Sequence, residues 1–352
     1  MIAIDEPVGT TYRAYARYTY DTEQNQLIRA NLFRYGDTGT VTDTYLYTYD
    51  TAGNIRSEEK TIRENGVTTT QYTKTYSYGN AQWKDLLTAV NGQSITYDNS
   101  GNPTEYPIGD TVYAMTWENG RQLSSFYKVD TSLPSGYWTV SFQYDADGIR
   151  TEKQVPYGNR GRYTVYSYVT QNGKIVRQSN NRGDLAKVLD FIYDAQGAPF
   201  ALNYSENNGG DFTTYYYILN LQGDVVKLVD DAGVEVAAYT YDAWGNILTA
   251  SGDLAYTNPL RYRGYYYDTE TGFYYLQSRY YDPANHRFIN ADTYASTGQG
   301  FMGTNMFAYC NNNPLVLEDT GGNRANYCTM MTDAGKNDHS ETLPSRIYCG
   351  SG

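Results

Sequence analysis

A five-residue pattern, Tyr-Asp-x-x-Gly, recurs along the chain at a nearly constant interval and constrains the fold more than any other feature. Successive tyrosines of the pattern are 48, 47, 49 and 48 residues apart. A period this regular over five copies indicates a repeat architecture, in which each copy belongs to one small structural unit. The copies begin at Tyr49, Tyr97, Tyr144, Tyr193 and Tyr241.

The pattern itself predicts a turn, because Asp can bond its own backbone two residues on and Gly supplies the left-handed position. Asn-Gly pairs fall near the middle of most intervals, and Asn-Gly between strand-like runs is the strongest short signal for a β-hairpin. The chain also contains 41 Tyr and 33 Gly, which favour strands and turns respectively. We therefore expect an all-β protein built as a succession of antiparallel hairpins. The Asn-Gly pairs are Asn65-Gly66, Asn91-Gly92, Asn119-Gly120 and Asn172-Gly173.

The tyrosine that opens each turn is interpreted as architecture. Its ring ends a strand as a cross-strand packing partner and its hydroxyl is left for a hydrogen bond. The alternative is that rows of tyrosine bind sugars or peptides.

Charge and composition exclude several classes of partner. The formal charge is −12, and no Lys/Arg cluster of the kind that binds phosphate is present, so no nucleic-acid partner is expected. No apolar run is long enough to span a membrane, and no signal peptide is visible. Only two histidines occur, and no Gly-rich phosphate loop is found. We therefore expect no metal and no cofactor.

The segment from Leu260 to Gly322 lacks the repeat and carries motifs of its own. Together with the Tyr-Asp repeats, these motifs resemble the RHS/YD-repeat family and its RHS-associated core, over about residues 18–322. The family includes bacterial polymorphic toxins, Tc-toxin C subunits and the teneurins. The motifs are Arg261-Tyr-Arg-Gly-Tyr265, Tyr267-Asp-x-Glu-Thr-Gly-x-Tyr-Tyr-Leu276, Arg279-Tyr-Tyr-Asp-Pro283, Arg287-Phe288 and Asn312-Asn-Pro314.

The resemblance implies a fold in which one long antiparallel sheet of repeat hairpins winds into a spiral, here a partial shell, with the core block as a plug at one end. A spiral leaves few exposed strand edges. The predicted domains are repeats at 1–259, the core at 260–322, and a variable C-terminal stub at 323–352 that could be a truncated effector.

The resemblance also implies a role in encapsulation and delivery. The shell would hold its own C-terminal effector, with further N-terminal repeats or a component of a secretion apparatus as other partners, and the protein would be secreted or delivered to the cell surface. One alternative is an aspartic-type autopeptidase that cuts once between the core and the C-terminal segment. Another is a cell-surface adhesion protein that binds carbohydrate.

For self-cleavage, the family pattern places the chemistry on Arg287, Asp292 and Asp319. Two carboxylates held close together share a proton, so one activates water while the other protonates the substrate. The bond predicted to break joins Asn323 to Arg324. This is single-turnover chemistry at most.

The sequence departs from the family pattern at two positions beside Asp319. Thr320 replaces a proline, and Asn323 replaces a leucine that would seat the cleavage site in a pocket. A displacement of about 1 Å can lower a rate about 100-fold, so both changes bear on whether cleavage is retained. The alternative for both aspartates is a role in a turn or cap.

Overall fold

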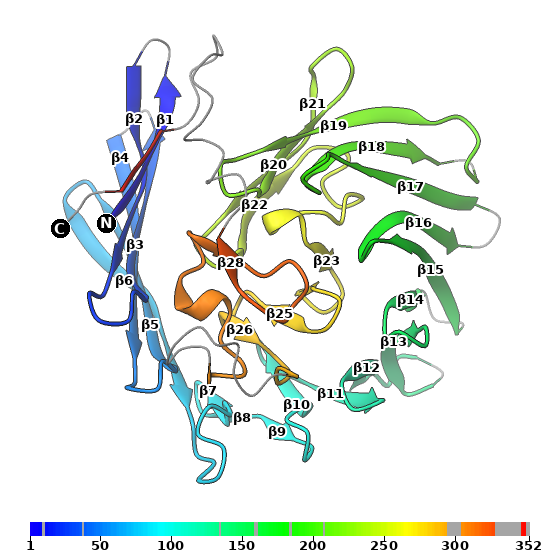
Figure 1. The fold of residues 1–352 in the computed structure, drawn as a ribbon, viewed down its shortest axis with the longest axis horizontal. Helices are drawn as coiled ribbons and strands as arrows, with labels where there is room; N and C mark the ends of the chain where they lie inside the picture. Colours follow the sequence, from blue (N-terminus) through cyan, green and yellow to red (C-terminus); the bar gives the residue numbers. More distant parts are fainter. Residues whose placement is uncertain are drawn as a thin grey trace. The chain divides into compact units, whose positions relative to one another are not determined.

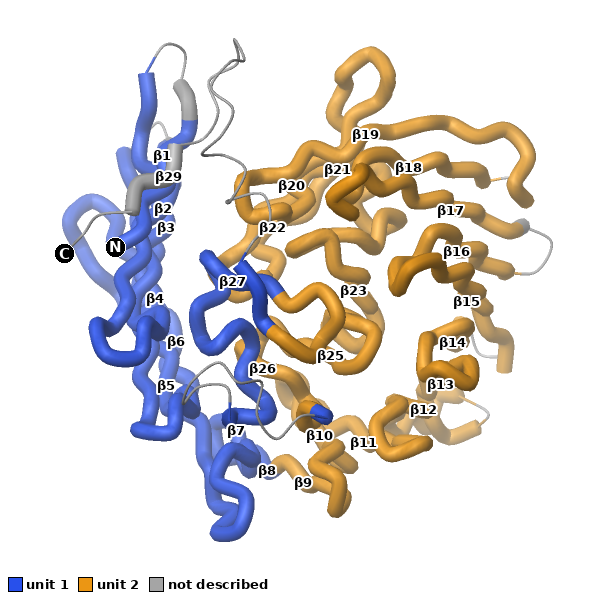
Figure 2. The backbone as a smooth tube through the Cα atoms, in the orientation of Figure 1, with its two compact units in different colours: residues 1–94, 293–318, 325–352 blue, residues 95–292, 319–324 orange. Residues whose placement is uncertain are grey.

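The computed structural model describes residues 1–8, 11–36, 39–133, 135–157, 161–182, 185–206, 208–293, 304–327 and 346–349. The chain divides into two compact units (Figure 2). Unit 1 consists of residues 1–94, 293–318 and 325–352, and unit 2 of residues 95–292 and 319–324. Most of the predicted stub, 323–352, lies outside the described residues, and the predicted domain boundaries stay a prediction.

Unit 1 contains a nine-stranded antiparallel sheet in which strands that follow one another in the chain also pair with one another (Figure 1). A strand from the C-terminal region, β29, is the exception and pairs with β1. The strands are β1 (Ile2–Val8), β2 (Thr11–Tyr20), β3 (Leu27–Gly36), β4 (Gly39–Tyr49), β5 (Ile55–Glu64), β6 (Val67–Ser77), β7 (Ala89–Val90), β8 (Gln93–Ser94) and β29 (Arg346–Cys349).

Residues 304–318 of unit 1 pack against a repeat turn of this sheet. Asn305 Nδ2 donates to Asn54 Oδ1 at 3.0 Å, and Asn312 Nδ2 donates to the Gly53 carbonyl at 2.7 Å. The segment thus uses the polar groups of a turn as its binding surface. It includes the 3-10 turn η3 (Cys310–Asn312) and β27 (Leu317–Glu318), and β27 pairs with β28 (Asn326–Tyr327).

Unit 2 contains a fourteen-stranded antiparallel sheet with the same neighbour-to-neighbour order, which curves around a small four-stranded sheet in Figure 1. Its strands are β9 (Thr96–Tyr97), β10 (Pro103–Ile108), β11 (Thr111–Glu118), β12 (Gln122–Val129), β13 (Tyr137–Tyr144), β14 (Arg150–Tyr157), β15 (Arg162–Gln171), β16 (Lys174–Arg182), β17 (Leu185–Tyr193), β18 (Pro199–Ser205), β19 (Thr213–Leu219), β20 (Val225–Val229), β21 (Glu235–Tyr241) and β22 (Ile247–Ser251). The prediction of an all-β chain of long antiparallel sheets is confirmed.

The first complete repeat shows why Tyr-Asp-x-x-Gly forms a turn. Asp50 Oδ1 accepts hydrogen bonds from the backbone N–H groups of Ala52 and Asn54, both at 2.9 Å. The register shifts by one residue at Tyr49, at the end of β4. The Tyr49 hydroxyl then donates to the Leu27 carbonyl at 2.7 Å. The motif therefore ties the turn to itself and to the preceding hairpin.

The same arrangement recurs in unit 2. In the repeats that begin at Tyr144, Tyr193 and Tyr241, each tyrosine hydroxyl donates to the carbonyl of Leu123, Ile175 or Val225 respectively. These hydroxyls are bonded to the backbone of the sheet, as expected for tyrosines that serve architecture. The glycines of the five turns, Gly53, Gly101, Gly148, Gly197 and Gly245, all have positive φ.

The Asn-Gly pairs form the hairpin turns that the sequence predicts. Both residues of each pair have positive φ, as in Asn119 (47°) and Gly120 (85°) between β11 and β12. This is the type I′ combination whose twist matches that of the flanking strands. The prediction is confirmed at all four pairs.

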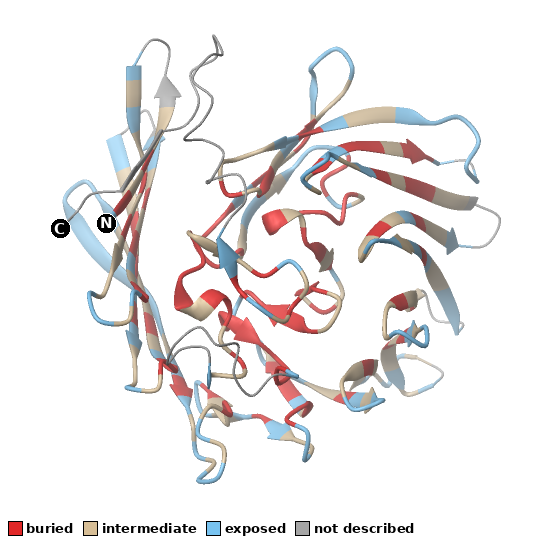
Figure 3. Ribbon diagram, in the orientation of Figure 1, coloured by how far each residue is buried: buried red, intermediate tan, exposed pale blue. Residues whose placement is uncertain are grey.

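The four-stranded sheet of unit 2 is formed by the first half of the predicted core block. Its strands are buried almost throughout (Figure 3). It follows the 3-10 turn η1 (Tyr262–Gly264) and comprises β23 (Tyr266–Asp268), β24 (Phe273–Tyr275), β25 (Tyr280–Asp282) and β26 (Arg287–Phe288).

Buried polar contacts fix this small sheet to the large one. The Tyr280 and Tyr144 hydroxyls are 2.7 Å apart, and the Tyr106 hydroxyl donates to Asp282 at 2.7 Å. Because buried polar groups without partners are destabilising, these pairs select one position of the block on the sheet. No helix among the described residues is long and apolar enough to cross a membrane.

A buried arginine surrounded by aromatic rings also links the two sheets. Arg150 at the start of β14 is fully buried, and its guanidinium carbon lies 4.2 Å from the centre of the Tyr275 ring and 5.0 Å from those of Tyr168 and Tyr266. Such contacts attract a cation to the ring faces. Its charge is balanced by Asp268 on β23, at 2.5 Å.

Candidate functional site

Three charged side chains meet in the interior of unit 2. Arg279, Asp292 and Asp319 are each at least 96% buried. Arg279 Nη2 lies 2.9 Å from Asp292 Oδ2 and 3.3 Å from Asp319 Oδ2. One guanidinium nitrogen of Arg279 therefore contacts both carboxylates. The two carboxylate oxygens consequently lie near each other. The structure thus brings together the two aspartates that the sequence singled out.

The hairpin formed by β25 and β26 explains how Arg279 meets Asp292. The strands pair Tyr281 with Phe288, and the pairing continues outward through a hydrogen bond from Ile289 N to Tyr280 O at 3.0 Å. Arg279 precedes β25 and Asp292 follows β26, so the hairpin returns them to the same end. Asp319 comes directly after β27 in the chain.

Arg287, the arginine selected from the family pattern, lies within β26 opposite Asp282. It is also buried, and its catalytic role stays a prediction. The arginine that forms ion pairs with both aspartates is Arg279, which the sequence interpretation treated only as part of a motif. Extending the hairpin register outward from Asp282 and Arg287 brings Arg279 beside residue 290, but strands this short give only a weak signal of their register.

Burial is the largest influence on the pKa values of Arg279 and Asp319. Burial lowers the pKa of Arg279, and the nearby carboxylates of Asp292 and Asp319 oppose that change. Burial likewise raises the pKa of Asp319, against Arg279 and the backbone N–H groups that point at its carboxylate. A raised pKa favours the protonated acid, which is the form a proton donor needs.

A second arginine faces Asp292. Arg121 Nη1 donates to the carbonyl of Ala291 at 3.1 Å, and the charge of Asp292 opposes the lowering of the Arg121 pKa by burial. Asp292 thus has two guanidinium groups nearby. The two carboxylates of the site therefore have different surroundings.

The Asp319 carboxylate holds the chain that follows it. Asp319 Oδ1 accepts from the backbone N–H of Asn323 at 3.0 Å and from that of Arg324 at 3.2 Å. Its own N–H donates to the Tyr265 hydroxyl at 2.9 Å. This is the geometry of a turn-forming aspartate, and it also places the carboxylate against the predicted cleavage bond, Asn323–Arg324.

The two residues before Asn323 are held by Ser278 and Arg279. The Ser278 hydroxyl lies 2.7 Å from the carbonyl oxygens of both Gly321 and Gly322. Arg279 Nε also donates to the Gly322 carbonyl. The backbone of residues 321–324 is therefore in direct contact with side chains of the site.

Gly322 is required by this close approach. Its φ is 73°, and a Cβ at this position would lie 2.7 Å from the Leu276 carbonyl oxygen and 2.8 Å from Ser278 Oγ. No side chain fits there without displacing backbone. The second glycine of the Thr-Gly-Gly sequence is thus explained by contact with residues 276–278.

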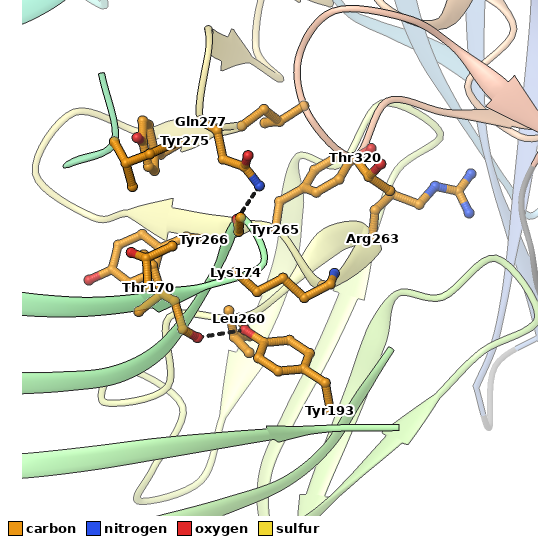
Figure 4. A pocket seen from close by; sticks show the side chains of 15 residues that line it. Thr170, Lys174, Tyr193, Leu260, Arg263, Tyr265, Tyr266, Tyr275, Gln277 and Thr320 are labelled. Atoms are coloured by element: carbon orange, nitrogen blue, oxygen red, sulfur yellow. Dashed lines mark hydrogen bonds between the residues drawn. The ribbon is translucent and has the colours of Figure 1, made fainter. Parts of the chain in front are cut away.

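A small cavity is lined in part by Thr320, which follows Asp319 in the chain (Figure 4). It has a volume of about 60 Å³, and Tyr265, Leu276, Gln277 and Thr320 contribute to its wall. A cavity of this volume is large enough to hold water. Thr320, where the family pattern has proline, thus contributes to the cavity wall next to Asp319.

Comparison with known proteins agrees with this architecture. A tRNA3(Ser)-specific nuclease, WapA, from Bacillus spizizenii is 33% identical over 301 residues, covering 85% of this chain and 11% of that protein. Human Teneurin-4 is 24% identical over 294 residues, covering 78% of this chain and 10% of its own. The chain thus spans about a tenth of the length of these curated relatives.

Solved structures show the same fold. The Photorhabdus luminescens Tc holotoxin pore matches with a TM-score of 0.72 at 18% identity, over 95% of this chain and 16% of that one. The family described as Teneurin YD-shell matches residues 4–315. The repeat turns, the meandering sheets and this match together establish that the chain belongs to the teneurin YD-shell family, the RHS/YD-repeat proteins.

Proposed function

We propose that this chain forms the wall of an encapsulating β-shell, that its block 260–322 is the plug, and that the shell holds a C-terminal effector. The observation that supports this most directly is the attachment of the block to the curved sheet of unit 2. The fully buried Arg150–Asp268 pair and the Tyr144–Tyr280 hydrogen bond connect residues more than 100 positions apart in the chain. A block held in this way is suited to close a wall.

The partners follow from the same proposal. The chain covers only a small part of each relative, so further repeats and an effector are expected in the whole protein. WapA is named as a tRNA nuclease. We propose that the C-terminal effector of this protein is also a toxin, and we assign it no target. Delivery outside the producing cell, with a secretion-apparatus component as partner, completes the proposal.

Protection of the effector tests encapsulation. In the full-length natural protein, a protease should leave the segment after the core intact under native conditions and digest it once urea opens the sheet. The same segment expressed alone is the control. Equal digestion rates for the enclosed and the isolated segment would rule out a shell.

A second proposed function is a single self-cleavage at the junction between the core and the C-terminal segment, and contacts of Asp319 favour it. In this reaction Asp292 accepts a proton from water, Asp319 supplies a proton to the leaving nitrogen, and Arg279 holds both carboxylates in place. Arg287 stays the arginine predicted from the family pattern. The carbohydrate-binding alternative gains no support from the repeat tyrosines Tyr49, Tyr144, Tyr193 and Tyr241, whose hydroxyls bond the backbone.

Intact-mass measurement tests self-cleavage. Freshly expressed protein should separate into two fragments near Asn323, and Asp292→Asn should keep the chain in one piece. Asp190→Asn serves as a matched control because Asp190 is also paired with an arginine, Arg177, but at an exposed position. An intact wild-type chain after long incubation would remove this function.

A further inference from the structure

The donors of the site converge on one carbonyl, that of Gly322. It accepts from the guanidinium Nε of Arg279, and the Ser278 hydroxyl lies 2.7 Å away. Two donors on one carbonyl oxygen polarise it and stabilise the negative charge that develops there during attack by water. Among the contacts of the segment 319–324, this is the arrangement closest to an oxyanion hole.

The nitrogen of the same peptide bond, that of Asn323, also has a hydrogen-bond partner in the site. The N–H of Asn323 lies 3.0 Å from Asp319 Oδ1. In hydrolysis, this nitrogen is the one that must gain a proton as the bond between Gly322 and Asn323 breaks. Asp319 is therefore within hydrogen-bonding reach of the leaving group of that bond.

The planar guanidinium of Arg279 links the two ends of this arrangement. Its Nε faces the Gly322 carbonyl, while Nη2 on the same edge contacts Asp292 at 2.9 Å. Arg279 therefore contacts the Gly322 carbonyl and both carboxylates at the same time. The preceding residue, Ser278, also binds the neighbouring carbonyl, since its backbone N–H donates to Gly321 O at 3.4 Å and leaves the hydroxyl proton for Gly322.

We propose that the bond on which this site acts is Gly322–Asn323, one residue before the bond that the family pattern predicts, and that the Ser278 hydroxyl is one of the two donors to its carbonyl. The proposal rests on the self-cleavage function proposed above. Water adds to the Gly322 carbonyl carbon and gives a proton to Asp292. The carbon–nitrogen bond breaks as Asp319 protonates Asn323 N, leaving a Gly322 carboxylate and a new amino terminus.

The tight packing around Gly322 supports Gly322–Asn323 as the bond that is cut. Its backbone approaches Leu276 and Ser278 so closely that a Cβ does not fit, so the Gly322 carbonyl has little freedom to turn away from its donors. A near-attack geometry depends on such restriction. By contrast, Asn323 is only half-buried, and Asp319 is the partner that holds its backbone N–H.

Sequencing the amino terminus of the released C-terminal fragment tests the bond directly. We expect it to begin at Asn323. A fragment that begins at Arg324 would overturn the assignment while leaving self-cleavage intact. An uncut chain would remove the self-cleavage function and this inference with it, so the two failures are distinguishable.

The role of Ser278 has its own test. Ser278→Ala should slow cleavage by about 100-fold, the usual effect of losing one oxyanion donor, and Ser278→Thr should restore much of the rate because it keeps the hydroxyl. Ser124→Ala is the control, since Ser124 bonds the Thr116 hydroxyl at 2.8 Å on the large sheet. Thermal unfolding of each variant shows whether it folds.

A second readout covers any variant that cleaves slowly for structural reasons. In the Asp292→Asn background, hydrogen exchange at the Asn323 amide should rise when Ser278 is changed to alanine and stay low with threonine. Unchanged cleavage in a folded Ser278→Ala protein would show that Ser278 does not position the bond.

Discussion

Arg150 and Asp268 form an ion pair in which both side chains are fully buried, with Nη1 and Oδ2 2.5 Å apart. Asp268 also binds Lys153 Nζ at 2.9 Å, and Lys153 reaches Glu270 at 2.8 Å. This network joins β14 of the large sheet to β23 and the residues that follow it. It attaches the core block electrostatically to the large sheet within unit 2.

Removing one partner of this pair should be strongly destabilising. Arg150→Met leaves Asp268 buried with less compensation, and breaking a buried pair in this way typically costs about 3–5 kcal/mol. This loss of stability is measured by urea unfolding, followed through the fluorescence of unit 2. Arg177→Met, which breaks an exposed pair with Asp190, should change stability by less than about 1 kcal/mol. Similar losses in both variants would contradict a special role for the buried pair.

The same network predicts acid sensitivity. Burial alone would raise the pKa of Asp268, but Arg150 and Lys153 outweigh it and the pKa is lowered below its ordinary value of 3.8. A carboxylate with a lowered folded pKa stabilises the fold above its unfolded pKa. That contribution should be complete above about pH 4 and decline as the pH falls further. In Asp268→Asn this part of the pH dependence should be absent from urea-unfolding curves.

Self-cleavage should have the opposite dependence on acid. Burial raises the pKa of Asp319 above 3.8, and the protonated form is the proton donor. The rate should therefore fall as the pH rises through the folded pKa of Asp319, and Asp319→Asn should be inactive. Single-turnover rates followed by gel across the pH range measure this. A rate that climbs steadily with pH would assign the proton donor elsewhere.

Removing only the hydroxyl of a repeat tyrosine should lower the free energy of unfolding of the protein. Tyr241→Phe leaves the Val225 carbonyl without the hydrogen bond it receives at 2.8 Å, and an unsatisfied buried group costs about 1–3 kcal/mol. Tyr256→Phe is the control because Tyr256 is 75% exposed. Equal unfolding midpoints for the two variants would mean that the hydroxyls do not hold the hairpins together.

Two turn glycines separate backbone conformation from packing. Gly233 and Gly245 have φ of 77° and 87°, but a Cβ at Gly233 meets nothing within 4 Å, whereas one at Gly245 would lie 2.6 Å from the Tyr262 ring. Gly233→Ala should cost about 1–2 kcal/mol, the penalty for a left-handed residue. Gly245→Ala should cost about 1–3 kcal/mol more from overpacking. Thermal unfolding of the pair measures the difference.

The hairpins could be predicted from sequence because their signals are local. Asn119-Gly120 and the turn after Tyr144 contain the residues that their own backbone needs, so no distant contact had to be known. The position of the core block was different. The pairing of Arg150 with Asp268 joins residues 118 positions apart, and neither residue has a local signal that names its partner.

The candidate site could be predicted only in part. Asp292 and Asp319 were selected from a family pattern, and the structure places both on one arginine. Arg279 was missed because its role depends on the register of the hairpin between β25 and β26, which short strands specify weakly. The contact of Ser278 with Gly322 depends on a chain crossing that no local pattern encodes.

The neighbour-to-neighbour order of both large sheets has a consequence for how such chains change. Apart from the pairing of β29 with β1, each strand forms its hydrogen bonds with the strands immediately before and after it in the chain, as in other linear repeats. Duplicating one repeat therefore inserts strands whose partners arrive with them, and no other strand needs a new register. The length of the sheet is then a variable that gene duplication can adjust in whole units, while residues 260–292 remain a single fixed part.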